Sequence, residues 1–174
     1  MNLVFRLLVF ISLFTLQASL KADNSNKNEF LAQAFGEMFA EAKSEKLWLN
    51  DGLQAKVTKI LDHKYPKLRL SYWQIKNNKQ TVWFLDEIGK ERPISFAISI
   101  INQRVSLIKV LEFRESRGGE IQMSSFTEQF NNIGLNDESL LDQNIDGISG
   151  ATMSITAMKK ITRLALMLHN EVSD

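Results

Sequence analysis

The chain has 174 residues, which suffices for one domain with a hydrophobic core and leaves little room for a second. Its 21 Lys and Arg residues nearly balance its 20 Asp and Glu residues, so no strong field attracts nucleic acid or another polyanion. Cysteine is absent, which excludes disulfides and thiolate metal sites.

Residues 1–22 have the layout of a secretory signal peptide. One positive charge at Arg6 precedes an apolar run over residues 7–16, and small residues close the segment up to Ala22. The run is shorter than the roughly 20 residues that a transmembrane helix needs. We therefore predict export to the periplasm or an equivalent compartment, with cleavage after Ala22. An uncleaved membrane anchor is the alternative.

Residues 23–67 are predicted to form a helical segment after a flexible start at residues 23–28. Apolar residues recur at helical spacing over residues 30–42 and again over residues 51–63, and Pro66 ends the second pattern. Two N-terminal helices are therefore expected. Their aromatic and methionine stripe is typical of core packing.

From Leu68 the pattern changes to that of a mostly antiparallel sheet. Four stretches of strand-forming residues follow one another with short polar links, which favours a meander and an α+β fold. The aromatic side chains Tyr72, Trp73 and Trp83 are expected to pack within the sheet rather than against a ligand ring. The stretches are residues 68–72, 81–85, 94–101 and 105–113.

A charged, glycine-containing loop at residues 112–121 follows the last predicted strand. Its adjacent glycines, Gly118 and Gly119, indicate backbone at positive φ and close approach to another group. Arg117 can pair with a phosphate or with an electron-rich ring edge. Residues 125–128 then fit a capping box, S-x-x-E, which predicts a short helix.

The stretch DGISGATMS, residues 146–154, precedes the clearest helical pattern of the chain, near its C-terminus. Ser149 or Thr152 can cap that helix. The free N–H groups and the positive dipole end of a helix start suit an anion, and Gly150 and Ala151 let a bulky group approach. Phosphate is the expected ligand.

DGISGATMS resembles the flavinylation motif of the FMN-binding domain in flavoprotein subunits of sodium-pumping quinone reductases and related ferredoxin-dependent complexes. The resemblance spans roughly residues 68–174. It implies a mostly antiparallel α+β domain whose C-terminal helix is headed by the flavin attachment motif. It also implies FMN joined to Thr152 by a phosphoester bond, and Asp146 recognised by a flavin transferase. For Asp146, an ordinary turn residue before Gly147 is an equal alternative. The immediate surroundings of the flavin phosphate would be Ser149, Gly150 and Ala151.

The same resemblance implies that the glycine-containing loop lies beside the flavin. Arg117, Gly118 and Gly119 would then be cofactor-binding positions. For Glu115, a place beside the flavin and a plain surface turn are equal alternatives.

The remaining polar residues show no catalytic or metal-binding pattern. His63 and His169 are the only histidines, they share no ligand spacing, and we predict both to be solvated helix residues. The basic side chains of the C-terminal helix, Lys159, Lys160 and Arg163, are likewise predicted to form a solvated face.

The predicted organisation is a signal peptide at residues 1–22, a helical segment at residues 23–67 and an FMN-binding domain at residues 68–174. The predicted function is electron relay through covalent FMN in an exported protein, closer to an electron-transfer flavoprotein than to a self-contained enzyme. A membrane-associated electron donor, a downstream acceptor and the flavin transferase are the implied partners. The alternatives are a noncatalytic exported ligand-binding module with unmodified Thr152, and a reductase of a small acceptor.

Overall fold

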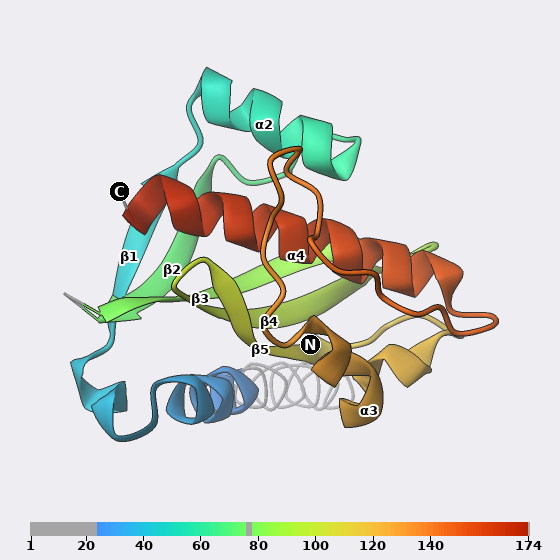
Figure 1. The fold of residues 1–174 in the computed structure, drawn as a ribbon, viewed down its shortest axis with the longest axis horizontal. Helices are drawn as coiled ribbons and strands as arrows, with labels where there is room; N and C mark the ends of the chain where they lie inside the picture. Colours follow the sequence, from blue (N-terminus) through green and yellow to red (C-terminus); the bar gives the residue numbers. More distant parts are fainter. Residues whose placement is uncertain (1–23, 76–77, 174) are drawn as a thin grey trace, which may run out of the picture.

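The computed structural model describes residues 24–75 and 78–173, so the predicted signal peptide lies outside the described residues. The fold is α+β, with a five-stranded antiparallel sheet and helices on both of its faces (Figure 1). Strand order follows chain order, which confirms the predicted meander and adds one strand at its start. The strands are β1 (Lys43–Trp48), β2 (Arg69–Ile75), β3 (Asn78–Ile88), β4 (Pro93–Ile101) and β5 (Arg104–Glu112).

Strand β1 was not predicted, because its sequence KSEKLW lacks the apolar alternation of a half-buried strand. Its side chains are almost all exposed, and its place in the sheet comes from backbone pairing with β2, from Lys43 opposite Gln74 to Trp48 opposite Arg69. Backbone hydrogen bonds to the partner strand therefore hold this edge strand in place, without an apolar side-chain face of its own.

The first described residues, 24–35, are helical, so the flexible start predicted for residues 23–28 is wrong wherever the structure describes it. Phe30 and Leu31 anchor this helix in an apolar cluster with Val82 and Ala97 of the sheet. The remaining helices are η1 (Gly36–Glu41), α2 (Asp51–Leu61), η2 (Gly119–Gln122), α3 (Ser124–Thr127), η3 (Glu128–Phe130) and α4 (Thr152–Ser173).

The predicted capping box is wrong as well. Helix α3 begins at Ser124, so Ser125 lies inside it, and Met123 stands at the N-cap position without a side-chain cap. The carbonyl of Met123 accepts hydrogen bonds from the N–H groups of Phe126 and Thr127, both at 3.0 Å. The preceding 3-10 turn η2 delivers the chain directly into α3, which sets the start of the helix one residue before Ser125.

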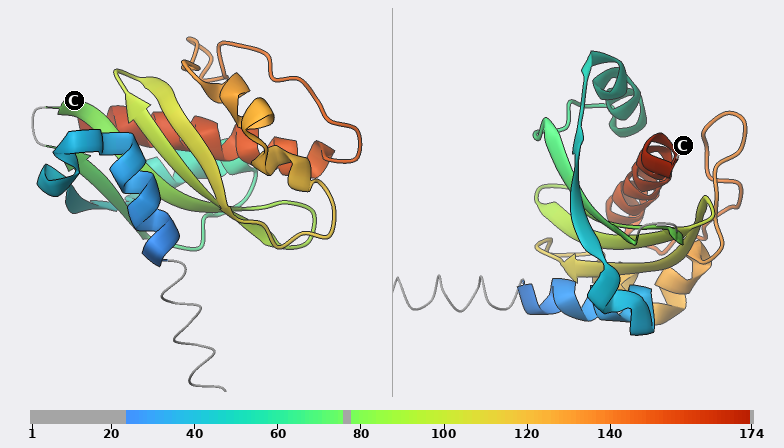
Figure 2. Two further views of the ribbon diagram at one scale, coloured as in Figure 1. Left: turned by 90° about the horizontal axis from the view of Figure 1, so that it is seen from below. Right: turned by 90° about the vertical axis from the view of Figure 1, so that its left-hand side faces the viewer.

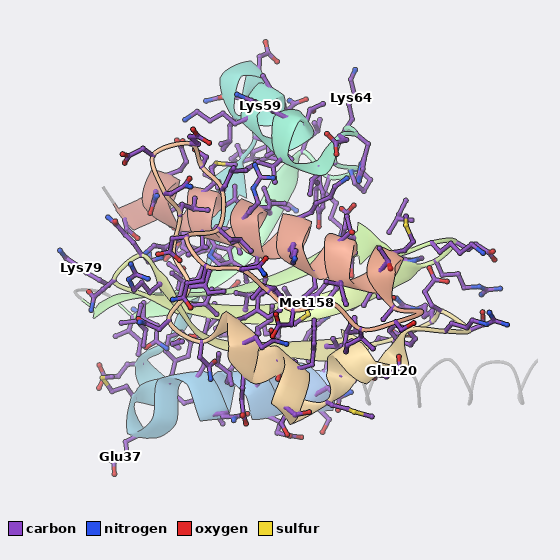
Figure 3. All side chains as sticks on the ribbon, turned by 45° about the vertical axis from the view of Figure 1, so that its right-hand side comes forward. Glu37, Lys59, Lys64, Lys79, Glu120 and Met158 are labelled. Carbon is purple, nitrogen blue, oxygen red and sulfur yellow. The ribbon has the colours of Figure 1, made fainter. Side chains whose placement is uncertain are left out.

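The central strands are buried on both faces. The N-terminal helix covers one face of the sheet, and α4 crosses the other face with α2 beside it (Figures 1 and 2). Neighbouring residues of a strand point to opposite faces, so Val82 packs under the N-terminal helix while Trp83 packs under α4. Trp83 stacks on its cross-strand neighbour Tyr72 with ring centroids 4.8 Å apart, which confirms the packing expected for these two rings. Met158, labelled in Figure 3, is fully buried between α4 and the sheet.

His169 is buried rather than solvated, because it lies on the sheet-facing side of α4. Its Nδ1 lies 2.8 Å from the Thr81 hydroxyl oxygen, and the Gln103 N–H donates to its Nε2 at 3.3 Å. The indole N–H of Trp83 donates to the same Thr81 oxygen at 2.8 Å. Burial lowers the pKa of His169 to about 4, so the ring is neutral at neutral pH.

His63 lies just beyond the end of α2 and is only partly exposed. Its Nδ1 is 3.0 Å from the Lys64 carbonyl, and its Nε2 is 3.0 Å from a carboxylate oxygen of the buried Glu87. Hydrogen bonds to the Lys64 carbonyl and to Glu87 raise the pKa of His63. The prediction of a freely solvated helix residue is therefore wrong for His63 too.

The basic side chains of α4 hold neighbouring segments in place instead of forming a solvated face. Each donates a hydrogen bond to a backbone carbonyl of a segment that packs on the helix. The pairs are Lys159 with Ile145 at 3.0 Å, Lys160 with Leu61 at 2.7 Å, and Arg163 with Ser139 at 3.0 Å.

Within residues 24–75 and 78–173, no helix has both the length and the apolar content that crossing a membrane requires.

Candidate functional site

The motif at residues 146–154 forms the tight turn that leads into α4. Gly150 has φ +85°, a conformation that favours glycine, and the Ala151 N–H closes the turn on the Ile148 carbonyl at 3.0 Å. Thr152 is the first residue of the helix, and Ala151 precedes it. Neither Ser149 nor Thr152 caps the helix in the described structure, so the capping role predicted for them is wrong.

The exposed side chain of Thr152 has its hydroxyl available for chemistry. In the part of the chain that the structure describes, this hydroxyl forms no hydrogen bond, whereas the Thr152 carbonyl accepts one from Thr156 at 2.9 Å. The amide N–H groups of residues 152–154 likewise have no protein acceptor among the described residues. Helix starts present such donors to anions.

The glycine-containing loop packs directly against this helix start. Gly118 has φ +86°, and a Cβ added there would lie 2.6 Å from the Ser154 hydroxyl oxygen and 3.3 Å from the Ala151 Cα. Only a residue without a side chain fits between these atoms. The structure therefore brings Gly118 beside the motif, although η2, α3, η3 and the stretch that follows them lie between the two segments in the sequence.

The prediction of positive φ is wrong for Gly119. Gly119 is the first residue of η2 and does not have positive φ, because a 3-10 helix requires negative φ. A Cβ added to Gly119 would meet no atom nearer than the Gln122 amide nitrogen, at 3.4 Å. Of the two glycines in this loop, Gly118 is therefore the one that packs closely against the start of α4.

Two hollows open where the loop meets the helix start. The first has a volume of about 530 Å³ and is lined by Thr152, Met153 and Ser154 of α4 together with Lys90 and Arg117. The second, of about 550 Å³, lies along η2 and contains Ser149, Gly118, Gly119 and Met123. Ser116, Arg117 and Gly150 line both hollows, so the two are parts of one depression.

Two cationic side chains, Arg117 and Lys90, line the hollow of Thr152 together with the carboxylates of Glu91 and Glu115. Arg117 is exposed, and among the described residues its guanidinium has no ion-pair or hydrogen-bond partner. Lys90 comes from the turn between β3 and β4, and its Nζ lies 3.8 Å from a carboxylate oxygen of Glu91. Lys90 escaped sequence reasoning because the hairpin turn reaches the motif only through the tertiary fold.

Two predicted site residues, Ala151 and Asp146, line neither hollow; Ala151 is buried beneath Gly118, whereas Asp146 lies outside the depression. The side chain of Asp146 is exposed, and its backbone N–H donates to the Gln129 side-chain oxygen at 2.8 Å. An exposed position at the edge of the site is compatible with recognition by another protein and gives Asp146 no contact inside the depression.

The chemistry of the depression suits a ligand that joins a phosphate to a flat apolar ring. Each hollow lies within the range of about 300–1,000 Å³ that is usual for small-molecule sites. Free N–H groups, Arg117 and Lys90 match a phosphate, while Met153 and Met123, 51% and 57% exposed, offer apolar surface to a ring.

The family model described as FMN-binding domain matches residues 89–167 of the chain. This range runs from the turn after β3 to the later part of α4 and contains every residue that lines either hollow. No relative was found among curated proteins.

Proposed function

Because residues 89–167 belong to the FMN-binding domain family and FMN is the cofactor of that family, we propose that this protein is an exported flavoprotein that relays electrons through FMN bound covalently to Thr152. The proposed linkage is a phosphoester between the Thr152 hydroxyl and the FMN phosphate. One observation carries it. The free Thr152 hydroxyl opens into a hollow of about 530 Å³ inside the family match.

The residues around Thr152 fit a phosphate diester. The unpaired N–H groups of residues 152–154 point out of the start of α4, where the helix dipole favours negative charge. Gly150 has no side chain and lines both hollows, so it leaves space beside the phosphate, whereas the buried Ala151 packs against Gly118. Arg117 and Lys90 supply further positive charge to the same hollow.

Bound FMN supplies the capacity to accept and donate electrons, one or two at a time. Thr152 would hold the cofactor, and the glycine-containing loop and the β3–β4 turn would line its surroundings. Arg117, which lines the same hollow as Thr152, would supply a cation that favours added negative charge on the flavin. The absence of a catalytic group pattern in the sequence favours electron relay to partner proteins over self-contained catalysis.

Covalent attachment suits an exported protein. Free FMN is dilute outside the cytoplasm, and a bond to Thr152 makes retention independent of equilibrium affinity. The proposed partners are a membrane-associated electron donor, a downstream acceptor and the flavin transferase that installs FMN. The proposed export rests on the signal-peptide layout of residues 1–22.

Replacement of Thr152 by valine tests the linkage. Valine is nearly isosteric and lacks the hydroxyl, so Thr152→Val should lose the FMN adduct and keep the fold. Thr156→Val is the matched control, because it makes the same change one turn later on the exposed side of α4. Both variants and the wild type are expressed in the exported compartment of a host with the flavin transferase, and their intact masses and in-gel flavin fluorescence are compared under denaturing conditions.

We expect the adduct in the wild type and in Thr156→Val, and its complete loss in Thr152→Val. An unmodified wild type would favour the noncatalytic binding module. An adduct retained in Thr152→Val would place the attachment elsewhere. Turnover of small acceptors with an artificial donor separates the reductase alternative from electron relay.

A further inference from the structure

The carboxylate of Glu115 gathers three backbone N–H groups on one oxygen atom. Oε1 accepts from the N–H groups of Lys90 at 2.6 Å, Glu91 at 2.7 Å and Arg92 at 2.9 Å. These donors form the turn between β3 and β4, whereas Glu115 belongs to the glycine-containing loop after β5. An ionised acceptor makes such hydrogen bonds stronger than a neutral one would.

The residue before these donors shows how tightly the turn is held. A Cβ added to Gly89 would lie 2.8 Å from Glu115 Oε1 and 3.0 Å from Ile94 Cδ1. Gly89 is also buried, and its N–H closes the turn on the Arg92 carbonyl at 3.0 Å. The turn therefore lies against the carboxylate at a distance that only glycine allows.

This contact links three segments around the proposed cofactor site. Glu115 stands two residues before Arg117 and three before Gly118, which presses on Ala151 and Ser154 at the start of α4. Lys90 and Glu91 line the same hollow as Thr152. Any movement of the turn away from Glu115 would thus change one wall of that hollow.

We propose that Glu115 is a positioning residue that fixes the β3–β4 turn as a wall of the flavin site and so limits the access of solvent to the bound ring. This inference rests on the proposed function at Thr152. Glu115 itself lines the hollow of Thr152, and the proposed role is carried by its hydrogen bonds to the backbone of residues 90–92.

The ionisation of Glu115 agrees with this role. The N–H groups of Arg92, Glu91 and Lys90 lower the pKa of Glu115, and the Lys90 ammonium acts in the same direction while burial opposes it. The carboxylate is therefore ionised at neutral pH and available to all three donors.

Glu115→Ala, Glu115→Gln and the matched control Glu112→Ala test the proposal. Glu112 is a nearby carboxylate on the same stretch of chain; it pairs with Arg114 and lines neither hollow. The first measurement is amide hydrogen exchange by NMR on full chains made without the flavin transferase. In Glu115→Ala the amides of residues 90–92 should lose their protection while those of the β3–β4 ladder keep theirs, and Glu112→Ala should match the wild type.

The second measurement uses flavinylated protein and records quenching of flavin fluorescence by iodide at constant high ionic strength, which screens the effect of the lost Glu115 charge on an anionic quencher. Glu115→Ala should raise the quenching constant above that of the wild type and of Glu112→Ala. Glu115→Gln keeps an oxygen acceptor without the charge, so it should give an intermediate value. This rescue separates positioning by hydrogen bonds from a loss of local folding.

The two proposals fail in different ways. FMN present in all variants, with iodide quenching in Glu115→Ala equal to that of the wild type, would overturn the inference and leave the proposed function intact. Retained protection of residues 90–92 in Glu115→Ala would also overturn it. A wild type without FMN would overturn the proposed function and this inference with it.

Discussion

Lowering the pH from 7 to 5 should destabilise the fold through His169, the buried histidine of α4. The Gln103 N–H donates to Nε2, which assigns the single proton of the neutral ring to Nδ1, facing the Thr81 hydroxyl. A second proton would have to occupy Nε2, which is out of water and faces the Gln103 N–H donor, with the Ser173 hydroxyl 3.5 Å away as a distant acceptor. The folded state therefore resists protonation, whereas the unfolded chain accepts the proton at the ordinary histidine pKa.

The size of the effect follows from the two pKa values. Burial lowers the pKa of His169 from 6.5 to about 4. Each pKa unit corresponds to about 1.4 kcal/mol, so full protonation of the unfolded state costs the fold about 3 kcal/mol. Because the folded pKa is depressed, this stability is present above pH 6.5 and declines as the pH falls toward 4. By pH 5 the expected loss is about 2 kcal/mol.

Urea denaturation at a series of pH values between 7 and 5 measures this slope. His169→Gln should flatten it, whatever the absolute stability of the variant. His63→Gln should leave the slope of His169 in place and remove an opposing contribution, because the raised pKa of His63 stabilises the fold below pH 6.5 and is lost as the pH rises. A wild type whose stability does not change from pH 7 to 5, or a His169→Gln variant with the wild-type slope, would refute the reasoning.

Two further predictions concern the glycine-containing loop. Gly118→Ala should destabilise the protein by at least about 1 kcal/mol, because it combines a left-handed φ with a Cβ 2.6 Å from the Ser154 hydroxyl oxygen. Gly119→Ala should lie close to the wild type in the same thermal denaturation experiment, and equal stabilities of the two variants would contradict the packing described for Gly118. Arg117→Ala should lower the midpoint potential of the bound flavin, since it removes a cation from the hollow of Thr152. A potential equal to that of the control Arg69→Ala in a spectroelectrochemical titration would show that Arg117 does not act on the ring.

Local sequence patterns determined most of the strands and the start of the C-terminal helix, because the spacing of apolar residues reflects which side chains have to be buried. Strands β2 to β5 were predictable from their side chains, since alternating or continuous apolar residues have to be buried on the faces of a sheet. The start of α4 was recognisable from Gly150, Ala151 and the apolar repeat that follows them. The motif around Thr152 also predicted the FMN-binding domain family, and the model of that family matches residues 89–167.

Tertiary structure decided the features that depend on partners distant in the sequence. Strand β1 exists because β2 offers it a hydrogen-bonding edge, and its own exposed side chains carry no signal of that pairing. His169 is buried because the sheet covers its side of α4. The polar residues near it in the sequence gave no sign that this side of the helix is buried. The sequence contains both glycines of the loop, yet only the approach of Ala151 and Ser154 distinguishes Gly118 from Gly119.

The same reason explains why Glu115 and Lys90 could not be assigned from sequence. A carboxylate gives no local sign of the N–H groups that it will accept, and a lysine in a hairpin turn resembles any other solvated lysine. Their relation to Thr152 arises only when the meander brings the β3–β4 turn, the loop after β5 and the start of α4 to one end of the sheet. Sequence patterns show which face of a single helix or strand is buried. The contacts that shape this site form between distant segments that the sheet brings together.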